Sequence, residues 1–326
     1  MRAIICTRFG APEQLAVREI PSPTPKPNEI VLAVKAAGVN FRDVLSIHDK
    51  YQVRPELPFC PGCEAAGLVT QVGRDVRTWK VGDRVAAFTM WGAFADETPA
   101  DERFVVRIPD AMDYRTAAAF LLSYGTADHG LRDRARLAPG ETLLVLGASG
   151  AAGIAAIEVG KVLGARVIAC ASTPEKVATC RRHGADETIN YQSEDLKQRI
   201  RDFTAGRGVD VVYDCVGGAY TEVALRSIAW RGRLVVVGFA SGHIPKLSLN
   251  LTLLKGSSTI GIWWGDFVRR EPLAFAESGR RLNQWYQAGA LAPHIARVFP
   301  LERAGDALNL IASRQSIGKP ILSMEA

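Results

Sequence analysis

The sequence predicts an α/β protein in which a doubly wound parallel sheet is joined to an irregular β-rich domain. Its first third reads as short strands separated by Pro- and Gly-marked turns, whereas strands and helices alternate from about residue 117. Such alternation is typical of a parallel sheet with helical crossovers. The chain has 326 residues, 48% of them hydrophobic. This length exceeds what one core usually supports, so two domains are expected.

Three apolar or alternating runs predict strands in the first third of the chain, at residues 30–35, 66–72 and 84–88. Turns are marked by a Pro-rich stretch at residues 21–27 and by Lys-Val-Gly-Asp at residues 80–83. Pro fixes φ and lacks an N–H, and Gly adopts conformations closed to other residues, so both end regular elements. We therefore expect a domain of short strands and loops.

The remainder of the chain predicts repeated strand–helix units. Strands are expected at residues 143–146, 166–169, 209–213 and 234–237, with helices at residues 152–163, 174–183 and 195–204. A further strand at residues 259–263 precedes helices that contain Trp285 and Ala307, and a last strand follows at residues 320–323.

The charge and hydropathy patterns predict neither a nucleic-acid partner nor a membrane span. The formal net charge of +6 is spread along the chain, and no long Lys/Arg run occurs. A nucleic-acid surface would need a clustered basic stripe with stacking aromatics, so no such partner is expected. No apolar stretch is long enough to span a bilayer, and the N-terminal one is too short for a signal peptide. We expect a cytoplasmic protein whose six cysteines are reduced.

The strongest local motif is LLVLGASGAAG at residues 143–153. It predicts a strand that passes through a tight turn into a helix, the arrangement that binds a dinucleotide pyrophosphate in Rossmann folds. The glycines are spaced G-x-x-G-x-x-G, and a plain strand-to-helix turn is the alternative. The flanking elements favour coenzyme binding by the small residues of this turn: Gly147, Ser149, Gly150, Ala151, Ala152 and Gly153.

The end of the second strand of this unit predicts which coenzyme is used. An NAD site would place Asp or Glu there to hold the ribose hydroxyls. Ser172 stands there instead and repels no 2′-phosphate, while Lys176 follows one helical turn later and would attract it. We therefore expect NADPH. The alternative for Lys176 is an ordinary exposed lysine.

Several ordered motifs resemble the medium-chain dehydrogenase/reductase superfamily: AGVNFRD at residues 37–43, PGCEAAG at 61–67, VGDRV at 81–85, the glycine turn, and VYDCVGG at 212–218. The resemblance implies a GroES-like catalytic domain that begins at residues 1–118. A Rossmann domain at residues 119–258 would be inserted in it. Residues 259–326 would then supply a dimerisation strand and a tail that returns to the catalytic domain. Nicotinamide and substrate would lie in the cleft between the domains.

The same resemblance implies that zinc is absent. The superfamily's alcohol dehydrogenases hold catalytic zinc with a Cys near the position of Asn40 and a His at the position of Cys63. No cysteine-rich lobe for a structural zinc occurs between residues 91 and 104. Cys60 and Cys63 spell C-x-x-C, which we interpret as two reduced thiols because no second ligand pair accompanies them. Cys63 is expected near the substrate cleft and open to alkylation.

Among the branches without zinc, the sequence is most similar to the quinone oxidoreductases. Without a metal, such an enzyme would polarise its acceptor by hydrogen bonds, which suits quinones and activated enones. The resemblance places Tyr51 in the cleft, as a proton or hydrogen-bond donor or as an aromatic wall. Asn40 would contact the nicotinamide ribose or the substrate carbonyl, and the alternative is an Asn that forms a turn.

The resemblance also assigns coenzyme contacts outside the glycine turn. Thr126 would bond the nicotinamide side of the pyrophosphate, whereas Tyr124 is expected to pack. Tyr191 would add a phenol near the adenosine phosphate, unless it is a surface residue. Lys319 would reach the coenzyme, with an exposed lysine as the alternative. The remaining contacts are expected at the ends of later strands: Val216, Gly238, Phe239 and Trp263.

Trp263 and Trp264 follow the expected dimerisation strand. Because adjacent strand residues face opposite ways, one would line the nicotinamide pocket and the other the dimer interface.

Three functions remain open. The first is an NADPH:quinone oxidoreductase, expected to form a homodimer. The second is an enoyl or acryloyl thioester reductase, in which a tyrosine comparable to Tyr51 donates a proton. The third is an NADPH-binding sensor with vestigial activity.

Overall fold

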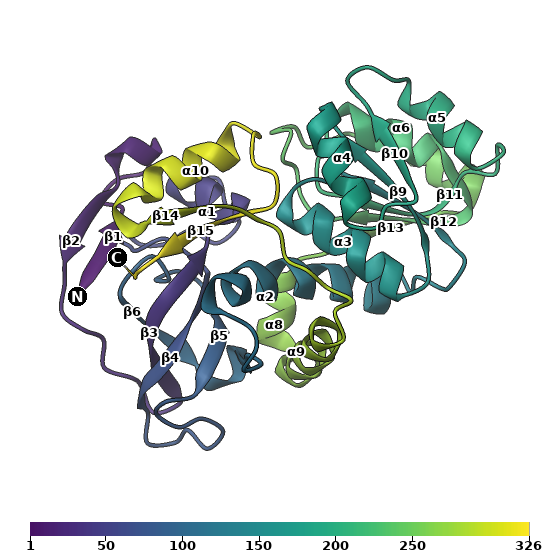
Figure 1. Cartoon of the computed structure of the whole chain (residues 1–326). Helices are drawn as coiled ribbons and strands as arrows, with labels where there is room; N and C mark the ends of the chain where they lie inside the picture. The colour runs from purple at the N-terminus through teal and green to yellow at the C-terminus, as the bar shows by residue number, and fades with distance from the viewer. Residues whose placement is uncertain (326) are drawn as a thin grey trace. The chain divides into compact units, whose positions relative to one another are not determined.

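The computed structural model describes residues 1–325, and the chain folds into two compact units (Figure 1). The β-rich unit consists of Met1–Leu122, Gly265–Gln287 and Pro293–Ala326. The Rossmann unit consists of Ser123–Trp264 and Ala288–Ala292. The expected α/β fold with a separate β-rich unit is confirmed.

The β-rich unit is built around a mostly antiparallel seven-stranded sheet in the order β14-β15-β3-β4-β5-β7, with β6 paired to β3. Its strands are β3 (Glu29–Gly38), β4 (Glu64–Val72), β5 (Arg84–Phe88), β6 (Glu97–Asp101), β7 (Val105–Arg107), β14 (Ile295–Pro300) and β15 (Lys319–Ser323). A separate antiparallel pair joins β1 (Arg2–Ile5) to β2 (Ala16–Glu19). All three strands expected in the first third are present.

The C-terminal tail completes this sheet. β15 pairs antiparallel with β3, with Ile321 opposite Gly38, and parallel with β14. Figure 1 shows the yellow C-terminal elements beside the purple N-terminal ones. The two ends share one core, which includes Val39, Ile47 and Leu322. The helices of this unit are α1 (Phe41–Ile47), α9 (Pro272–Gln287) and α10 (Ala304–Ala312), and most of α8 (Trp264–Arg270) belongs to it.

The Rossmann unit contains a six-stranded parallel sheet in the order β10-β9-β8-β11-β12-β13, the order of a dinucleotide-binding fold. Its strands are β8 (Thr142–Leu146), β9 (Arg166–Ala171), β10 (Glu187–Asn190), β11 (Val209–Asp214), β12 (Ile228–Val236) and β13 (Ser258–Gly261). Its helices are α3 (Ala151–Val162), α4 (Pro174–Arg182), α5 (Leu196–Phe203), α6 (Ala219–Arg226) and α7 (Asn250–Lys255). Helix α2 (Tyr114–Asp128) begins in the β-rich unit and ends in this one.

The pattern of apolar residues along the sequence explains which of these elements could be predicted. All five residues of β8 are buried, as expected for a central parallel strand covered on both faces. The four-residue strand β10 was not expected, because Glu187 and Asn190 flank only one large apolar residue. The strand expected at residues 259–263 ends at Gly261, and Trp264 begins α8. The strand alternation expected for Trp263 and Trp264 is therefore wrong.

Within residues 1–325, every helix is too short or too polar to cross a bilayer.

The turn between β8 and α3 requires glycine at two positions. Gly147 adopts φ of 71°, a left-handed conformation that disfavours side chains. A Cβ on Gly153 would lie 2.4 Å from the carbonyl oxygen of Gly147 and 2.6 Å from Cα of Ala148. Helix and turn thus approach each other backbone to backbone.

Replacing Gly153 with Ala should lower the free energy of unfolding by about 1–3 kcal/mol, because backbone must move to admit the methyl group. Gly261→Ala is the matched control, since a Cβ there would meet nothing within 4 Å. Urea unfolding without coenzyme would measure both variants. Equal stability of the two would show that the turn does not require the close approach.

Candidate active site and coenzyme site

The glycine turn lies at the carboxyl end of β8, where parallel sheets bind ligands. Gly150 is the N-cap of α3, and Ala151 and Ala152 form its first turn. The first N–H groups of a helix have no partner within the helix and carry partial positive charge, so they can hold a phosphate. Ser149 is buried in the same turn.

The neighbouring strand ends are held together by Asp214, the last residue of β11. Its carboxylate accepts hydrogen bonds from the backbone N–H groups of Val216 and Gly217 at 2.8 and 2.9 Å. Its backbone carbonyl accepts from Val237 and Gly238, which follow β12. The loops that carry Val216, Gly238 and Phe239 are thereby fixed beside the glycine turn. A Cβ on Gly147 would lie 2.8 Å from a methyl carbon of Val216.

Ser172, Lys176 and Tyr191 converge at the carboxyl end of β9. Nζ of Lys176 lies 3.3 Å from Oγ of Ser172, and the Tyr191 phenol also bonds this hydroxyl. Burial raises the pKa of Tyr191 to about 12, so its phenol keeps its proton as a donor. Burial also lowers the pKa of Lys176. The ring of Tyr191 packs against that of Tyr220, with centroids 4.4 Å apart, so Tyr191 is not a free surface residue.

The end of α2 carries Tyr124 and Thr126, both buried. The Tyr124 hydroxyl donates a 2.7 Å hydrogen bond to Glu158 of α3, which confirms its packing role. Glu158 also accepts from the backbone N–H of Ala292 at 2.8 Å and contacts Nδ1 of His183 at 2.6 Å. This buried carboxylate holds Tyr124 and so fixes the helix that carries Thr126.

A buried ion pair in the β-rich unit joins the first residue of β15 to the first residue of β4. Lys319 is 1% exposed and Glu64 is 0% exposed. Nζ of Lys319 lies 2.9 Å from Oε2 of Glu64 and also donates to Oδ1 of Asn40. The other carboxylate oxygen, Oε1, accepts from the backbone N–H of Leu122 at 2.7 Å. The exposed lysine considered for Lys319 is therefore wrong.

Asn40 is 8% exposed and ends the β3–α1 connection as the N-cap of α1. Its Nδ2 donates to the carbonyl of Gly38 at 3.1 Å and to Oε2 of Glu64 at 3.2 Å, while Oδ1 accepts from Lys319. Its backbone N–H donates to Asp43 at 2.8 Å. Burial raises the pKa of Asp43 to about 6. The amide of Asn40 is thus held in one orientation by its neighbours.

Tyr51 is half-buried and follows α1. The guanidinium of Arg42 stacks on its ring at 4.6 Å from the centroid. Arg42 is itself fixed by a 2.8 Å hydrogen bond to the carbonyl of Met90. Sequence reasoning missed this arginine, although Arg42 lies within one of the family motifs.

Both cysteines of the C-x-x-C pattern are free thiols. Cys63 is 0% exposed, and burial raises its pKa well above the usual range. Burial likewise raises the pKa of Cys60 to about 12. The expectation that Cys63 is open to alkylation is wrong, because its side chain is fully buried and burial disfavours the reactive thiolate.

The two tryptophans differ in exposure. Trp263 is 41% exposed, whereas Trp264 is buried with its ring against Gly125 of α2. Trp264 is therefore a packing residue, and Trp263 is the one that can face a ligand or a partner.

Comparisons with known proteins show the family of the chain. Residues 26–110 match the alcohol dehydrogenase GroES-like domain, and residues 151–278 match the zinc-binding dehydrogenase family. Quinone oxidoreductase-like protein 2 of Bos taurus is 40% identical over 325 residues, which cover 99% of this chain and 93% of that protein. The chain belongs to the quinone oxidoreductase branch of the medium-chain dehydrogenase/reductase superfamily.

Further relatives and structures support the assignment to this branch. The quinone oxidoreductase of Pseudomonas aeruginosa is 35% identical, covering 96% of this chain and 97% of the relative. The crystal structure of Escherichia coli quinone oxidoreductase complexed with NADPH has a TM-score of 0.94 at 30% identity. It covers 99% of this chain and all of that one. That of the Pseudomonas syringae enzyme has a TM-score of 0.93 at 32% identity, with 99% of both chains covered.

In this quinone oxidoreductase-branch protein, Lys319→Met should lower the free energy of unfolding by about 3–5 kcal/mol, since it leaves the Glu64 carboxylate buried without its cation. The double variant Glu64→Gln/Lys319→Met should lose less than the sum of the two single variants.

The control for this prediction is Lys161→Met. Lys161 pairs with Asp186 at 2.8 Å, but both side chains are more than a third exposed, so its loss should cost at most about 1 kcal/mol. Urea unfolding would measure the wild-type chain and the four variants, Lys319→Met, Glu64→Gln, the double variant and Lys161→Met. A Lys319→Met variant no less stable than Lys161→Met would refute a structural role for the buried pair.

Proposed function

We propose that the chain is a cytoplasmic, zinc-independent oxidoreductase that uses NADPH to reduce quinones or activated enones. The observation that carries the proposal is the convergence of Ser172, Lys176 and Tyr191 at the end of β9. These side chains would donate hydrogen bonds to a 2′-phosphate. Ser172 stands where an NAD site has Asp or Glu, so no carboxylate repels the phosphate there. The six free cysteines favour a reducing compartment.

The residues of the Rossmann unit fit the coenzyme. Bound NADPH would supply a hydride from its nicotinamide ring. The glycine turn and the first turn of α3 would hold its pyrophosphate, and Thr126 would bond the nicotinamide side. Val216, Gly238 and Phe239 stand at strand ends where open α/β sheets bind ligands. We also assign Trp263 to this site.

Zinc does not fit the residues that stand at the superfamily's metal position. An amide, as in Asn40, is not among the usual zinc ligands, which are Cys, His, Asp and Glu side chains. Glu64 is already paired with the ammonium of Lys319. Within residues 1–325, no group of three or more His, Cys, Asp and Glu side chains is arranged to hold a metal ion.

Tyr51 is the side chain that we assign to the acceptor. A phenol donor stabilises the negative charge that develops on a quinone or enone oxygen as hydride arrives. Stacking on Arg42 would hold the ring in place. Asn40 would act by position, because Lys319 and Glu64 already engage its amide. Such a site supplies positioning and hydrogen bonds rather than a strong electrophile.

Replacing Tyr51 with Phe should lower kcat/KM for quinones by about a hundredfold or more, since it removes the proposed donor. Tyr114→Phe is the matched control. Tyr114 lies in the same unit and also carries a stacked arginine, Arg84, at 4.9 Å. NADPH oxidation with benzo- and naphthoquinones, followed at 340 nm, would measure the effect. Unchanged turnover in Tyr51→Phe would contradict the donor role.

The same assay separates the remaining functions. Crotonyl and acryloyl thioesters would be offered beside the quinones. Turnover of thioesters alone would place the chain with the enoyl reductases. Tight NADPH binding without turnover of any acceptor would indicate a sensor, and both outcomes would overturn the proposed substrate class.

Lys176→Ala should weaken NADPH binding by roughly 10- to 100-fold and leave NADH binding unchanged, because the ammonium would contact only the 2′-phosphate. Arg182→Ala is the control, a basic residue at the other end of α4. Fluorescence titration of both coenzymes would measure the preference. An equal loss for NADH would show that Lys176 does not read the phosphate.

We also propose that two copies associate through β13, the edge strand of the parallel sheet. Large apolar side chains are exposed on β12, which pairs with β13, and on the segment that precedes β13. They are Trp230 (68%), Leu249 (80%), Leu253 (77%) and Leu254 (65%). An unpaired strand edge with apolar neighbours favours pairing with another strand, and a second copy offers the same edge.

Leu253→Asp should convert the dimer to a monomer, because a charge would be buried at the interface. Leu273→Asp is the control, since Leu273 is 86% exposed on α9 of the other unit. Sedimentation velocity would measure both. A wild-type chain that sediments as a monomer would disprove the dimer.

A further inference from the structure

A hollow opens in the Rossmann unit at the opposite ends of the strands from the glycine turn. It has a volume of about 260 Å³ and is lined by Ile228, the first residue of β12, by Gly208, which precedes β11, and by α5. Strands β8, β11 and β12 run parallel. Their carboxyl ends hold the glycine turn, Asp214 and Gly238. The hollow is therefore at the amino ends, across the length of the sheet from the proposed coenzyme site.

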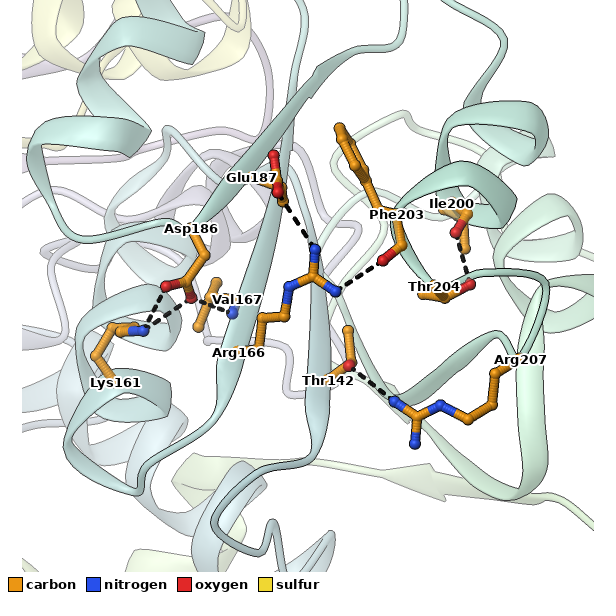
Figure 2. A network of polar contacts seen from close by, with 10 residues as sticks. All are labelled: Thr142, Lys161, Arg166, Val167, Asp186, Glu187, Ile200, Phe203, Thr204 and Arg207. Atoms are coloured by element: carbon orange, nitrogen blue, oxygen red, sulfur yellow. Dashed lines mark hydrogen bonds and ion pairs between the residues drawn. The ribbon is translucent and has the colours of Figure 1, made fainter.

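Figure 2 shows the amino ends of the neighbouring strands β8, β9 and β10. Arg166, the first residue of β9, donates to the carbonyl of Phe203 at 2.7 Å and pairs with Glu187, the first residue of β10. Arg207 reaches Oγ1 of Thr142, the first residue of β8, at 3.5 Å. These contacts tie the turn after α5 to the strands.

The charged side chains around this hollow are predominantly basic. Five are cationic and one is acidic. The cations are Lys197, Arg201, Arg207, Arg226 and Lys255, and the acid is Asp195. They come from separate elements along the chain, which explains why the sequence showed no basic cluster.

Ordinary pairing accounts for only part of this charge. Arg226 bonds Glu222 at 2.7 Å, and Arg207 lies 3.8 Å from Asp210. Asp195 caps α5 by accepting from the N–H of Gln198. In the described part of the chain, no hydrogen bond or ion pair engages the charged groups of the other three cations, which are Lys197, Arg201 and Lys255.

A cation near a helix C-terminus is common, because it offsets the partial negative charge there. Arg201, Arg226 and Lys255 each occupy the last turn of a helix, α5, α6 and α7 respectively. Each placement alone is ordinary. Here three helices direct such cations to one hollow, and Lys197 and Arg207 lie beside them. An anion bound there would offset the repulsion among these positive charges.

The size of the hollow limits the anion. Pockets for drug-sized ligands occupy roughly 300–1,000 Å³, and this one is smaller. Arginine and lysine are the side chains that bind phosphate by charge-assisted hydrogen bonds. We propose that this hollow binds a compact phosphorylated anion, a phosphate or diphosphate group, at a site separate from the coenzyme. The proposal does not depend on the proposed oxidoreductase activity.

Calorimetric titration with inorganic pyrophosphate, with and without saturating NADPH, tests the site. One equivalent should still bind when NADPH saturates the coenzyme site. Loss of all pyrophosphate binding on addition of NADPH would overturn the proposal, because it would place the anion in the coenzyme site alone. If NADPH itself failed to bind, the pyrophosphate result would still stand, so the two proposals fail separately.

Arg201→Glu and Lys255→Glu should each weaken pyrophosphate binding by about tenfold or more, since each replaces an attractive charge with a repulsive one. Arg18→Glu, the same change on an exposed residue of the other unit, should leave it unchanged. Equal affinity in all three variants would overturn the proposal. So would the absence of binding heat, or binding of a single-stranded oligonucleotide without binding of pyrophosphate.

Discussion

The ion pair between Lys319 and Glu64 is the contact on which the β-rich unit depends. It joins two residues that are 255 positions apart, and both charges are removed from water. Such a pair is stable only when the remaining polar atoms of its partners are satisfied. Asn40 and the N–H of Leu122 meet that requirement. The last strand of the chain, the β3–α1 turn and α2 are therefore fixed by one carboxylate and one ammonium.

The Rossmann unit is organised by backbone rather than by charge. Gly153 admits no side chain, and Asp214 uses its carboxylate and its carbonyl to hold the loops after β11 and β12. The outcome is a set of strand ends whose positions depend on main-chain hydrogen bonds. Such main-chain donors can hold the phosphate of a ligand with little reorganisation of the protein. They cannot do the same for a hydride-accepting substrate whose structure varies.

This difference explains what the sequence could predict. The glycine turn, β8 and α3 were predicted because local spacing and buried apolar runs specify them. The partners of Lys319 were not, because a contact between β15 and β4 leaves no local pattern. Glu64 offered one signal, a lone charge inside an apolar strand that needs a partner when buried. Arg42 lies in a family motif, but neither Arg42 nor Glu158 gave a local sign of burial, since charged residues on helices are ordinarily exposed.

The chemistry proposed for the acceptor follows from the same ion pair. A metal at the position of Glu64 would compete with the ammonium of Lys319, which already neutralises the carboxylate. An ammonium with 1% exposure, bonded to Asn40 and Glu64, stabilises the fold and is poorly placed to polarise a carbonyl. Activation is then left to hydrogen-bond donors such as Tyr51, which contribute less than a Lewis acid. Only acceptors that take a hydride readily suit that arrangement, and quinones and activated enones have this property.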